Sequence, residues 1–155
     1  MQDASGPCLI APLPEPSVRA AAGLLAASMR DNPLHLRVFG GDQARLEPLL
    51  AVAFARLLRR QRRAGHVLGA WQDGRLVGVA AMMPPGHCRP PPQDIVAMLG
   101  VLARAGALRR LPRIARWLWA WGRHDPEHDH WHLGPAAVER SHQGRGIGSR
   151  LMEAV

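Results

Sequence analysis

The run Gln143-Gly144-Arg145-Gly146-Ile147-Gly148 follows an apolar stretch and opens a helical pattern. Glycines at alternate positions let the main chain approach a ligand that a Cβ atom would keep away. A helix that begins at such a loop turns its unpaired N–H groups and the positive end of its dipole toward an anion. Arg145 adds a charged donor at the same point. The six residues therefore predict a loop that binds a phosphate group through its backbone.

The segment before this loop, His130-Trp131-His132-Leu133-Gly134-Pro135-Ala136-Ala137-Val138, has the composition of a strand that leads into the turn. Apolar residues recur at helical spacing from Ile147 onward. Strand, loop and helix together resemble the acetyl-CoA signature of the GCN5-related N-acetyltransferases, the GNAT superfamily. The signature, Gln or Arg, two residues, Gly, one residue, then Gly or Ala, is matched by Gln143, Gly146 and Gly148.

The resemblance implies a fold of α/β (α+β) class, with a mixed, mostly antiparallel sheet flanked by helices. It also implies that acetyl-CoA is the cosubstrate. In the family the loop wraps the pyrophosphate of coenzyme A, and the end of the strand contacts the pantetheine arm and the thioester oxygen. The implied contacts are the main chain of Ala136, Ala137 and Val138, and, around the pyrophosphate, Gln143, Gly144, Arg145, Gly146, Ile147, Gly148 and Ser149.

The strand also carries side chains suited to proton transfer. In histone-acetylating relatives a strand glutamate removes the proton of the amine, and His132 occupies the matching position. Histidine suits this role because its ordinary pKa of about 6.5 lies near neutral pH. Glu127, acting through a water molecule, is the second candidate for the catalytic base. A structural role of His132 in the sheet is the alternative.

Four histidines and three acidic residues fall between His124 and His132, which raises the question of a metal site. Alternation along a strand would place His130 and His132 on one face, where they could provide two ligands. No cysteine or third histidine at a recognised spacing completes a ligand set. The sequence therefore predicts no metal site.

The rest of the sequence gives the order of elements that such a domain requires. An Asp73-Gly74 pair between two apolar runs predicts a tight hairpin. Ser17 and Asp42 are the expected N-caps of two helices. The predicted elements are strands at 8–11, 66–71, 75–82 and 130–138, and helices at 17–29, 42–63, 93–105 and 108–121.

The GNAT plan joins the flanking strands closely, so we expect residues 84–129 to be approximately the extent of a helical insertion in a single, incomplete domain that spans 1–155. This insertion, together with Asp31-Asn32-Pro33, is similar to the branch that contains puromycin N-acetyltransferase. The insertion has an apolar stripe that we expect to pack on the sheet, although a lid over the acceptor or a membrane-surface role stays open. The stripe consists of Leu111, Ile114, Trp117, Leu118 and Trp121.

The formal charge of +8 comes from arginine alone, since all 20 basic residues are arginine. Twelve of them lie singly or in pairs along predicted helices rather than in one block, which argues against nucleic acid as the partner. No stretch approaches the ~18–20 apolar residues of a transmembrane helix, and no basic region of a signal peptide opens the sequence. Two cysteines are too few for a disulfide framework. We therefore expect a cytoplasmic protein without stable membrane insertion.

Matched against the GNAT plan, the sequence ends at Val155, inside the helix after the loop, so the C-terminal part of the domain is expected to be missing. The first interpretation is an acetyl-CoA-dependent N-acetyltransferase for a primary amine of a small molecule or peptide. The alternative is a non-catalytic or degenerate CoA-binding fragment that needs a further segment or a partner chain. A basic interaction protein is the third interpretation. The acceptor and a homodimer stay open.

Overall fold

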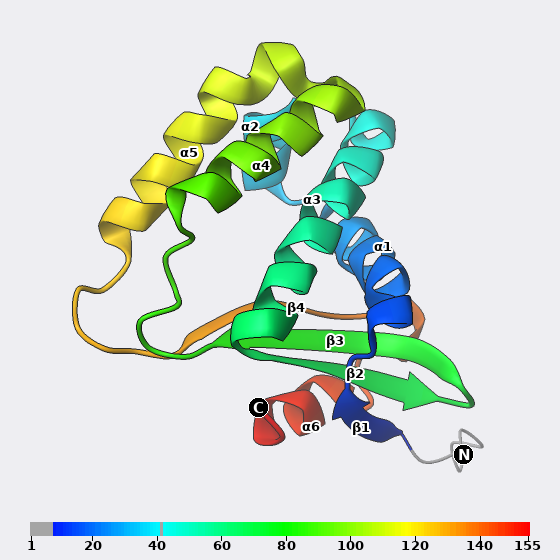
Figure 1. Cartoon of the computed structure of the whole chain (residues 1–155). Helices are drawn as coiled ribbons and strands as arrows, with labels where there is room; N and C mark the ends of the chain where they lie inside the picture. Colours follow the sequence, from blue (N-terminus) through cyan, green and yellow to red (C-terminus); the bar gives the residue numbers. More distant parts are fainter. Residues whose placement is uncertain (1–7, 41) are drawn as a thin grey trace.

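The computed structural model describes residues 8–40 and 42–155. Its four strands form one antiparallel sheet in the order β1-β2-β3-β4, with helices on both faces (Figure 1). The strands are β1 Leu9–Pro12, β2 His66–Gln72, β3 Arg75–Met83 and β4 His132–Val138. The helices are α1 Val18–Met29, α2 Pro33–Phe39, α3 Gln43–Ala64, α4 Pro92–Leu102, α5 Leu111–His124 and α6 Ile147–Glu153. The predicted fold class, a mainly antiparallel sheet flanked by helices, is confirmed.

The β2–β3 hairpin forms the centre of the sheet and turns at the predicted dipeptide. Asp73 and Gly74 have φ angles of 51° and 75°. Positive φ at both central residues is typical of the type I′ turn, whose twist matches that of the two strands. Pairing then runs from Gln72↔Arg75 to His66↔Met82. The turn therefore sets the register of the first pairs, and a shift between Ala70 and Trp71 sets the register of the remaining ones.

The helix starts follow the predicted caps in one case and not in another. Oδ1 of Asp42 accepts a hydrogen bond of 3.1 Å from the N–H of Ala44 and caps α3 as expected. Ser17 was predicted to cap α1 in the same way, which is wrong. Ser17 lies in a 3-10 turn that runs directly into α1, its backbone is already helical, and its side chain makes no capping bond.

Helix α2 was not predicted at all. The sequence predicted a helix at 17–29 and none between it and residue 42, whereas Pro33 occupies the first turn of a new helix, where a missing N–H costs nothing. Oδ1 of Asn32 accepts a hydrogen bond of 2.9 Å from the N–H of Leu34 and caps this helix. The Asp31-Asn32-Pro33 segment therefore both stops α1 and starts α2.

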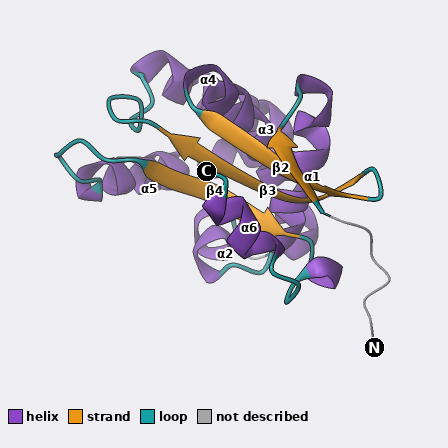
Figure 2. Cartoon of the chain, turned by 90° about the horizontal axis from the view of Figure 1, so that it is seen from below, coloured by secondary structure: helices purple, strands orange, loops and turns teal. Residues whose placement is uncertain are grey.

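Two apolar clusters lie on opposite faces of the sheet. Helices α1 and α3 pack on each other and cover one face, while α6 lies on the other (Figure 2). The larger cluster includes Leu25 of α1, Leu58 of α3 and Val79 of β3, all fully buried. The smaller one joins Ile147 and Leu151 of α6 to the sheet. Burial of α6 on the sheet fixes the helix that follows the glycine loop.

Helices α4 and α5 form a separate layer beside α2 and α3 (Figure 1). The stripe of α5 was expected to pack on the sheet, but it packs mainly on neighbouring helices, because α2 presents aromatic rings to it. The ring of Trp117 lies 6.2 Å from those of Phe39 and His35, in edge-on geometry. Trp121 instead reaches β4, where its ring lies 6.2 Å from that of His132. The end of α5 is thereby placed beside the start of β4.

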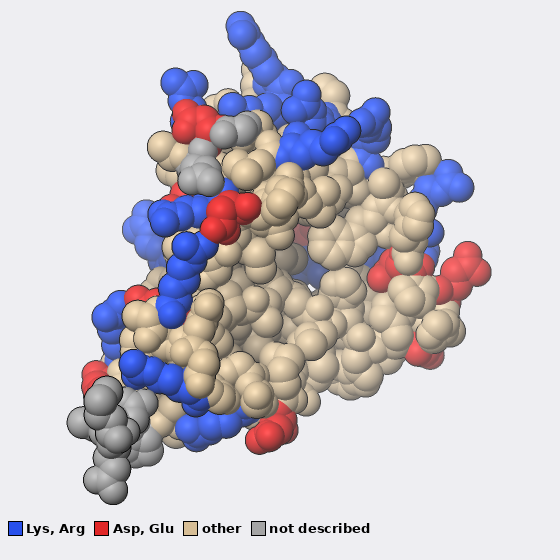
Figure 3. Space-filling model, turned by 180° about the vertical axis from the view of Figure 1, so that it is seen from behind, with Lys and Arg blue, Asp and Glu red and all other residues tan. Residues whose placement is uncertain are grey.

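The surface carries its arginines on many elements. Figure 3 shows the back of the molecule, where basic side chains lie along the upper and left parts with acidic ones between them, and the centre carries neither. Several arginines pair with acids, for example Arg60 with Asp94 at 3.2 Å and Arg30 with Glu47 at 3.2 Å. Within residues 8–40 and 42–155, no helix combines the length and the apolar character needed to cross a membrane.

Candidate functional site

The glycine loop lies between the end of β4 and the start of α6. Gly144 and Gly146 have φ angles of 76° and 74°, in the left-handed region. An ordinary residue there costs about 1–2 kcal/mol, so both positions favour glycine for conformational reasons. A Cβ atom built on either glycine would meet no heavy atom within 4 Å. The backbone of the loop therefore faces open space, where a ligand can approach it directly.

Contacts on both sides hold this loop in place. Nε2 of Gln143 donates a hydrogen bond of 2.9 Å to the carbonyl oxygen of Val138, back across the turn. Arg140, in the 3-10 turn before the loop, forms an ion pair with Asp31. The hydrogen bond from Arg140 lowers the pKa of the Asp31 carboxyl below its ordinary value. Behind the loop, Ile147 is 4% exposed, so its side chain anchors α6 and only its main chain can face a ligand.

The strand before the loop has an outer edge that no other strand covers within the described residues. In an antiparallel ladder, hydrogen-bonded and non-hydrogen-bonded pairs alternate. The N–H of Glu139 donates to the carbonyl oxygen of Val77 at 2.8 Å, which makes Ala137↔Val79 the next hydrogen-bonded pair. The main-chain groups of Ala136 and Val138 therefore point outward, while those of Ala137 point toward β3.

The β3–β4 register shifts between Ala80 and Met82, opposite Gly134 and Pro135. Proline has no N–H to donate, which fits a position where ladder pairing is interrupted. The carbonyl oxygen of Gly134 instead accepts a hydrogen bond of 2.7 Å from Nε2 of the buried Gln61 in α3. A helix side chain thus replaces the missing strand contact just ahead of the outward-facing groups.

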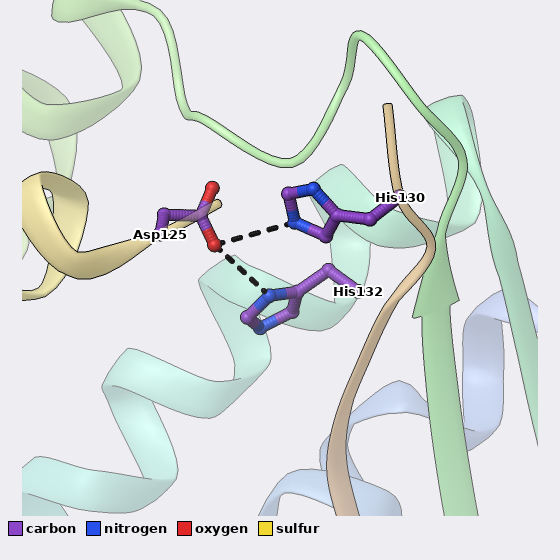
Figure 4. Close-up of side chains that lie close together, drawn as sticks. All are labelled: Asp125, His130 and His132. Atoms are coloured by element: carbon purple, nitrogen blue, oxygen red, sulfur yellow. Dashed lines mark ion pairs between the residues drawn. The ribbon is translucent and has the colours of Figure 1, made fainter. Parts of the chain in front are cut away.

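At the other end of β4, two histidines converge on Asp125, as Figure 4 shows. Oδ1 of Asp125 lies 3.4 Å from Nε2 of His130 and 3.7 Å from Nδ1 of His132. Asp125 lies at the C-terminal end of α5, where its N–H donates to the carbonyl oxygen of Trp121. We call these three residues the Asp125 cluster. Its side chains are only 10%, 20% and 30% exposed, in the order Asp125, His130, His132.

From the sequence, His130 and His132 of this cluster were named as possible ligands, but Asp125 was not. The strand was predicted from His130, but β4 begins at His132, so the two histidines do not share a strand face as expected. They meet because the chain before β4 folds back toward α5. Asp125 was not considered as a partner, although it was one of the three acidic residues counted in this segment. Glu127, the second predicted base, is exposed and makes no ion pair or hydrogen bond that we find in the described part of the chain.

The glycine loop and the Asp125 cluster occupy opposite ends of one strand. At the rise of a β-strand, His132 and Val138 are about 20 Å apart. The uncovered edge of β4 runs between them. This arrangement suits a long ligand with an anionic group at one end and a reactive group near the other.

Residues 42–155 match the family model described as Acetyltransferase (GNAT) family. No curated protein matches the chain. A solved structure described as histone acetyltransferase HPA2 and related acetyltransferase, from Corynebacterium glutamicum, is 21% identical with a TM-score of 0.63, over 95% of this chain and 68% of that one. A GNAT family acetyltransferase from Brucella melitensis, in complex with acetyl-CoA, is 17% identical with a TM-score of 0.49, over 96% and 65% of the two chains. The first likeness concerns the fold alone. On the match over residues 42–155, the chain belongs to the GNAT acetyltransferase family.

Proposed function

We propose that this chain binds acetyl-CoA and serves as an N-acetyltransferase for a primary amine of a small molecule or peptide. The observation that carries the proposal is the glycine loop, where two left-handed glycines expose backbone to open space at the start of α6. Unpaired N–H groups at a helix start are suited to a pyrophosphate. Membership of the acetyltransferase family supports coenzyme A as the source of that pyrophosphate.

The cosubstrate would lie along the outer edge of β4. Residues 143–149 would surround the pyrophosphate, with Arg145 adding a charged donor. The outward N–H and C=O groups of Ala136 and the outward N–H of Val138 would contact the pantetheine arm and the thioester oxygen. Ala137 would support them through its bonds to β3. The carbonyl oxygen of Val138 is already used by Gln143, which ties the strand contact to the loop.

The thioester would then approach the start of β4, where His132 is our first candidate for the base that takes the amine proton. The carboxylate of Asp125, 3.7 Å from its Nδ1, would orient the ring. Glu127 is the second candidate, since it is exposed on the connection before β4. Attack of the amine nitrogen on the thioester carbon would break the C–S bond, giving an amide and the thiol of coenzyme A.

The helices between β3 and β4 bear on where the acceptor would lie. We propose that α4 and α5 mark the branch that contains puromycin N-acetyltransferase, and that they line the acceptor side. Figure 3 shows this face hollowed between the helical layer and the sheet. The half-exposed ring of Trp121 beside His132 would give an amine an apolar flank. A panel of an aliphatic amine, an aminonucleoside and a peptide N-terminus would separate the acceptor classes.

The test is thiol release from acetyl-CoA with this amine panel, together with thermal unfolding in the presence of acetyl-CoA. Arg145→Gln should weaken acetyl-CoA binding about tenfold or more, because a hydrogen bond to a charged group contributes about 1.5–3 kcal/mol. Arg63→Gln removes the same charge from the exposed end of α3 and should leave binding unchanged. No stabilisation by acetyl-CoA and no thiol release would refute the proposal.

A non-catalytic CoA-binding domain is the second candidate function. Binding of the cosubstrate rests on the glycine loop and the outer edge of β4, and neither of these requires a catalytic base. Stabilisation by acetyl-CoA without thiol release for any amine would support this candidate. His132→Asn separates the two cases, since loss of a catalytic base lowers kcat about 10²–10⁴-fold and leaves a pure binding protein unaffected.

A further inference from the structure

The Asp125 cluster brings three donor atoms of different residues to one point between α5 and β4 (Figure 4). One oxygen and two ring nitrogens lie within 4.8 Å of one another. Both rings face the same carboxylate oxygen, Oδ1 of Asp125, rather than one oxygen each. Convergence of this kind fits a common partner located between the three side chains.

The separations fit coordination better than hydrogen bonding. A charge-assisted N–H···O bond is about 2.7–2.9 Å long, whereas the two N···O distances here are 3.4 and 3.7 Å. Ligand atoms about 2.0–2.2 Å from a tetrahedral Zn²⁺ are separated from one another by about 3.3–3.5 Å. The shorter N···O distance has this value and the longer one exceeds it slightly, and the two ring nitrogens lie within 4.8 Å of each other.

The hydrogen bonding of His130 prepares one of its nitrogens as a ligand. Its Nδ1 lies 2.8 Å from the carbonyl oxygen of His128, which can only accept, so Nδ1 carries the hydrogen. Nε2 is buried and makes no hydrogen bond within the described residues. In the neutral ring, Nε2 therefore directs a lone pair toward a carboxylate. Metal-bound histidines commonly donate their other ring N–H to a carbonyl in this way.

We propose that Asp125, His130 and His132 bind a divalent transition metal ion, with Zn²⁺ as the preferred ion. Two imidazoles and one carboxylate suit Zn²⁺, whereas Ca²⁺ and Mg²⁺ favour oxygen ligands alone. The partial exposure of His132 leaves the fourth position accessible from solvent. This site is independent of acetyl-CoA binding. Zn²⁺ would coordinate Nδ1 of His132, the nitrogen that faces Asp125. The metal-bound His132 could not act as the proposed base. If the proposed function holds, Zn²⁺ would therefore inhibit acetyl transfer.

Direct titration of the chelator-treated chain with ZnCl₂ tests the site, with Co²⁺ absorption as a readout of the coordination geometry. We expect one tight site per chain. Loss of an outer hydrogen-bond partner of a metal ligand lowers metal affinity by ~10–100-fold. Loss of a ligand itself should lower the affinity for Zn²⁺ further, in each of the variants Asp125→Asn, His130→Asn and His132→Asn. His124→Asn is the matched control, since His124 is exposed and its Nδ1 lies 2.7 Å from the carbonyl oxygen of Ala120 rather than at the cluster.

The proposal is overturned if the three variants bind Zn²⁺ as tightly as the wild type. It is also overturned if His124→Asn weakens binding as much as they do, because the ion would then be held nonspecifically by a histidine-rich segment. Asp125→Asn keeps the size of the side chain, so its loss of binding cannot be assigned to unfolding if thermal unfolding is unchanged. Acetyl-CoA binding is measured separately with chelator present, so failure of the metal site and failure of the proposed function give different results.

Discussion

Gln61 of α3 donates a hydrogen bond of 2.7 Å from Nε2 to the carbonyl oxygen of Gly134 in β4. The bond joins a helix to the strand at the point where the β3–β4 register shifts. Gln61 is only 2% exposed, so water does not replace the bond when it is lost. The pair therefore fixes the strand immediately before the residues proposed to contact the cosubstrate.

Replacement of Gln61 by leucine should destabilise the chain by about 1–3 kcal/mol, because the half-buried carbonyl oxygen of Gly134 loses its donor. Urea unfolding measures this change. Gln93→Leu, at an exposed position in α4, is the control and should leave the free energy of unfolding nearly unchanged. Equal stability of the two variants would show that the Gly134 carbonyl oxygen does not depend on Gln61.

The two glycines of the signature should respond in opposite directions to alanine. Gly146→Ala places a Cβ atom on a residue with φ of 74°, which should cost about 1–2 kcal/mol. Gly148 lies inside α6 without a positive φ, and its added Cβ would lie 3.9 Å from Cγ2 of Val138, an ordinary contact. Gly148→Ala should therefore stabilise the chain by about 0.5–1 kcal/mol. Thermal unfolding without cosubstrate compares the stabilities of the two variants. A loss of stability in both would contradict the prediction that Gly146 requires a left-handed backbone and Gly148 does not.

His35 should make stability depend on pH. Burial lowers the pKa of His35, and a hydrogen bond to the carbonyl oxygen of Met29 opposes this shift in part. The unfolded chain therefore binds more protons than the folded one below the ordinary histidine pKa of about 6.5. The free energy of unfolding should fall as the pH falls through that value toward the lower pKa of the folded state. His35→Phe should flatten this slope, whereas His124→Asn should retain it.

The Asp31–Arg140 ion pair should be visible in a carboxyl titration. The hydrogen bond from Arg140 holds the pKa of Asp31 below its ordinary value, so the contribution of the pair is present above that value and is lost as the pH falls through the lowered pKa. Arg140→Gln should raise the pKa of Asp31 toward the ordinary value, as measured by NMR. Arg19→Gln, an exposed change on α1, should not. An unchanged Asp31 titration in Arg140→Gln would show that the pair does not form in solution.

Features set by neighbouring residues were predicted well from the sequence. Asp73-Gly74 and Asp42 specify a turn and a cap through their own backbone and side chains, and the structure confirms both. Helix α2 was not predicted from the sequence, because a proline such as Pro33 can follow the end of one helix or begin the next. Which of the two occurs depends on the packing of α2 against α3 and α5. The sequence does not distinguish these two cases.

The candidate site likewise contains one part that the local sequence predicts and one part that depends on tertiary contacts. The glycine loop is a local motif, and its roles in binding coenzyme A remain predictions. Asp125 was missed because its meeting with His130 and His132 depends on how α5 is placed beside β4, which is a tertiary contact. The ring contact between Trp121 and His132 is part of that placement. A pattern search for histidine and cysteine spacing cannot find a carboxylate brought in by a neighbouring helix.

The sheet order has a consequence for the time course of folding. Only β2 and β3 are neighbours in the chain, whereas Leu9 pairs with Trp71 and Gly78 with Val138 across about sixty residues each. Local pairs close faster than distant ones, so we expect the β2–β3 hairpin to gain amide protection before either outer strand. Pulse-labelling hydrogen exchange would show this order, and early protection of β4 would contradict it. The strand that begins at His132 and leads into the glycine loop would then dock after the hairpin, and the proposed acetyl-CoA and metal sites would form only after the centre of the sheet.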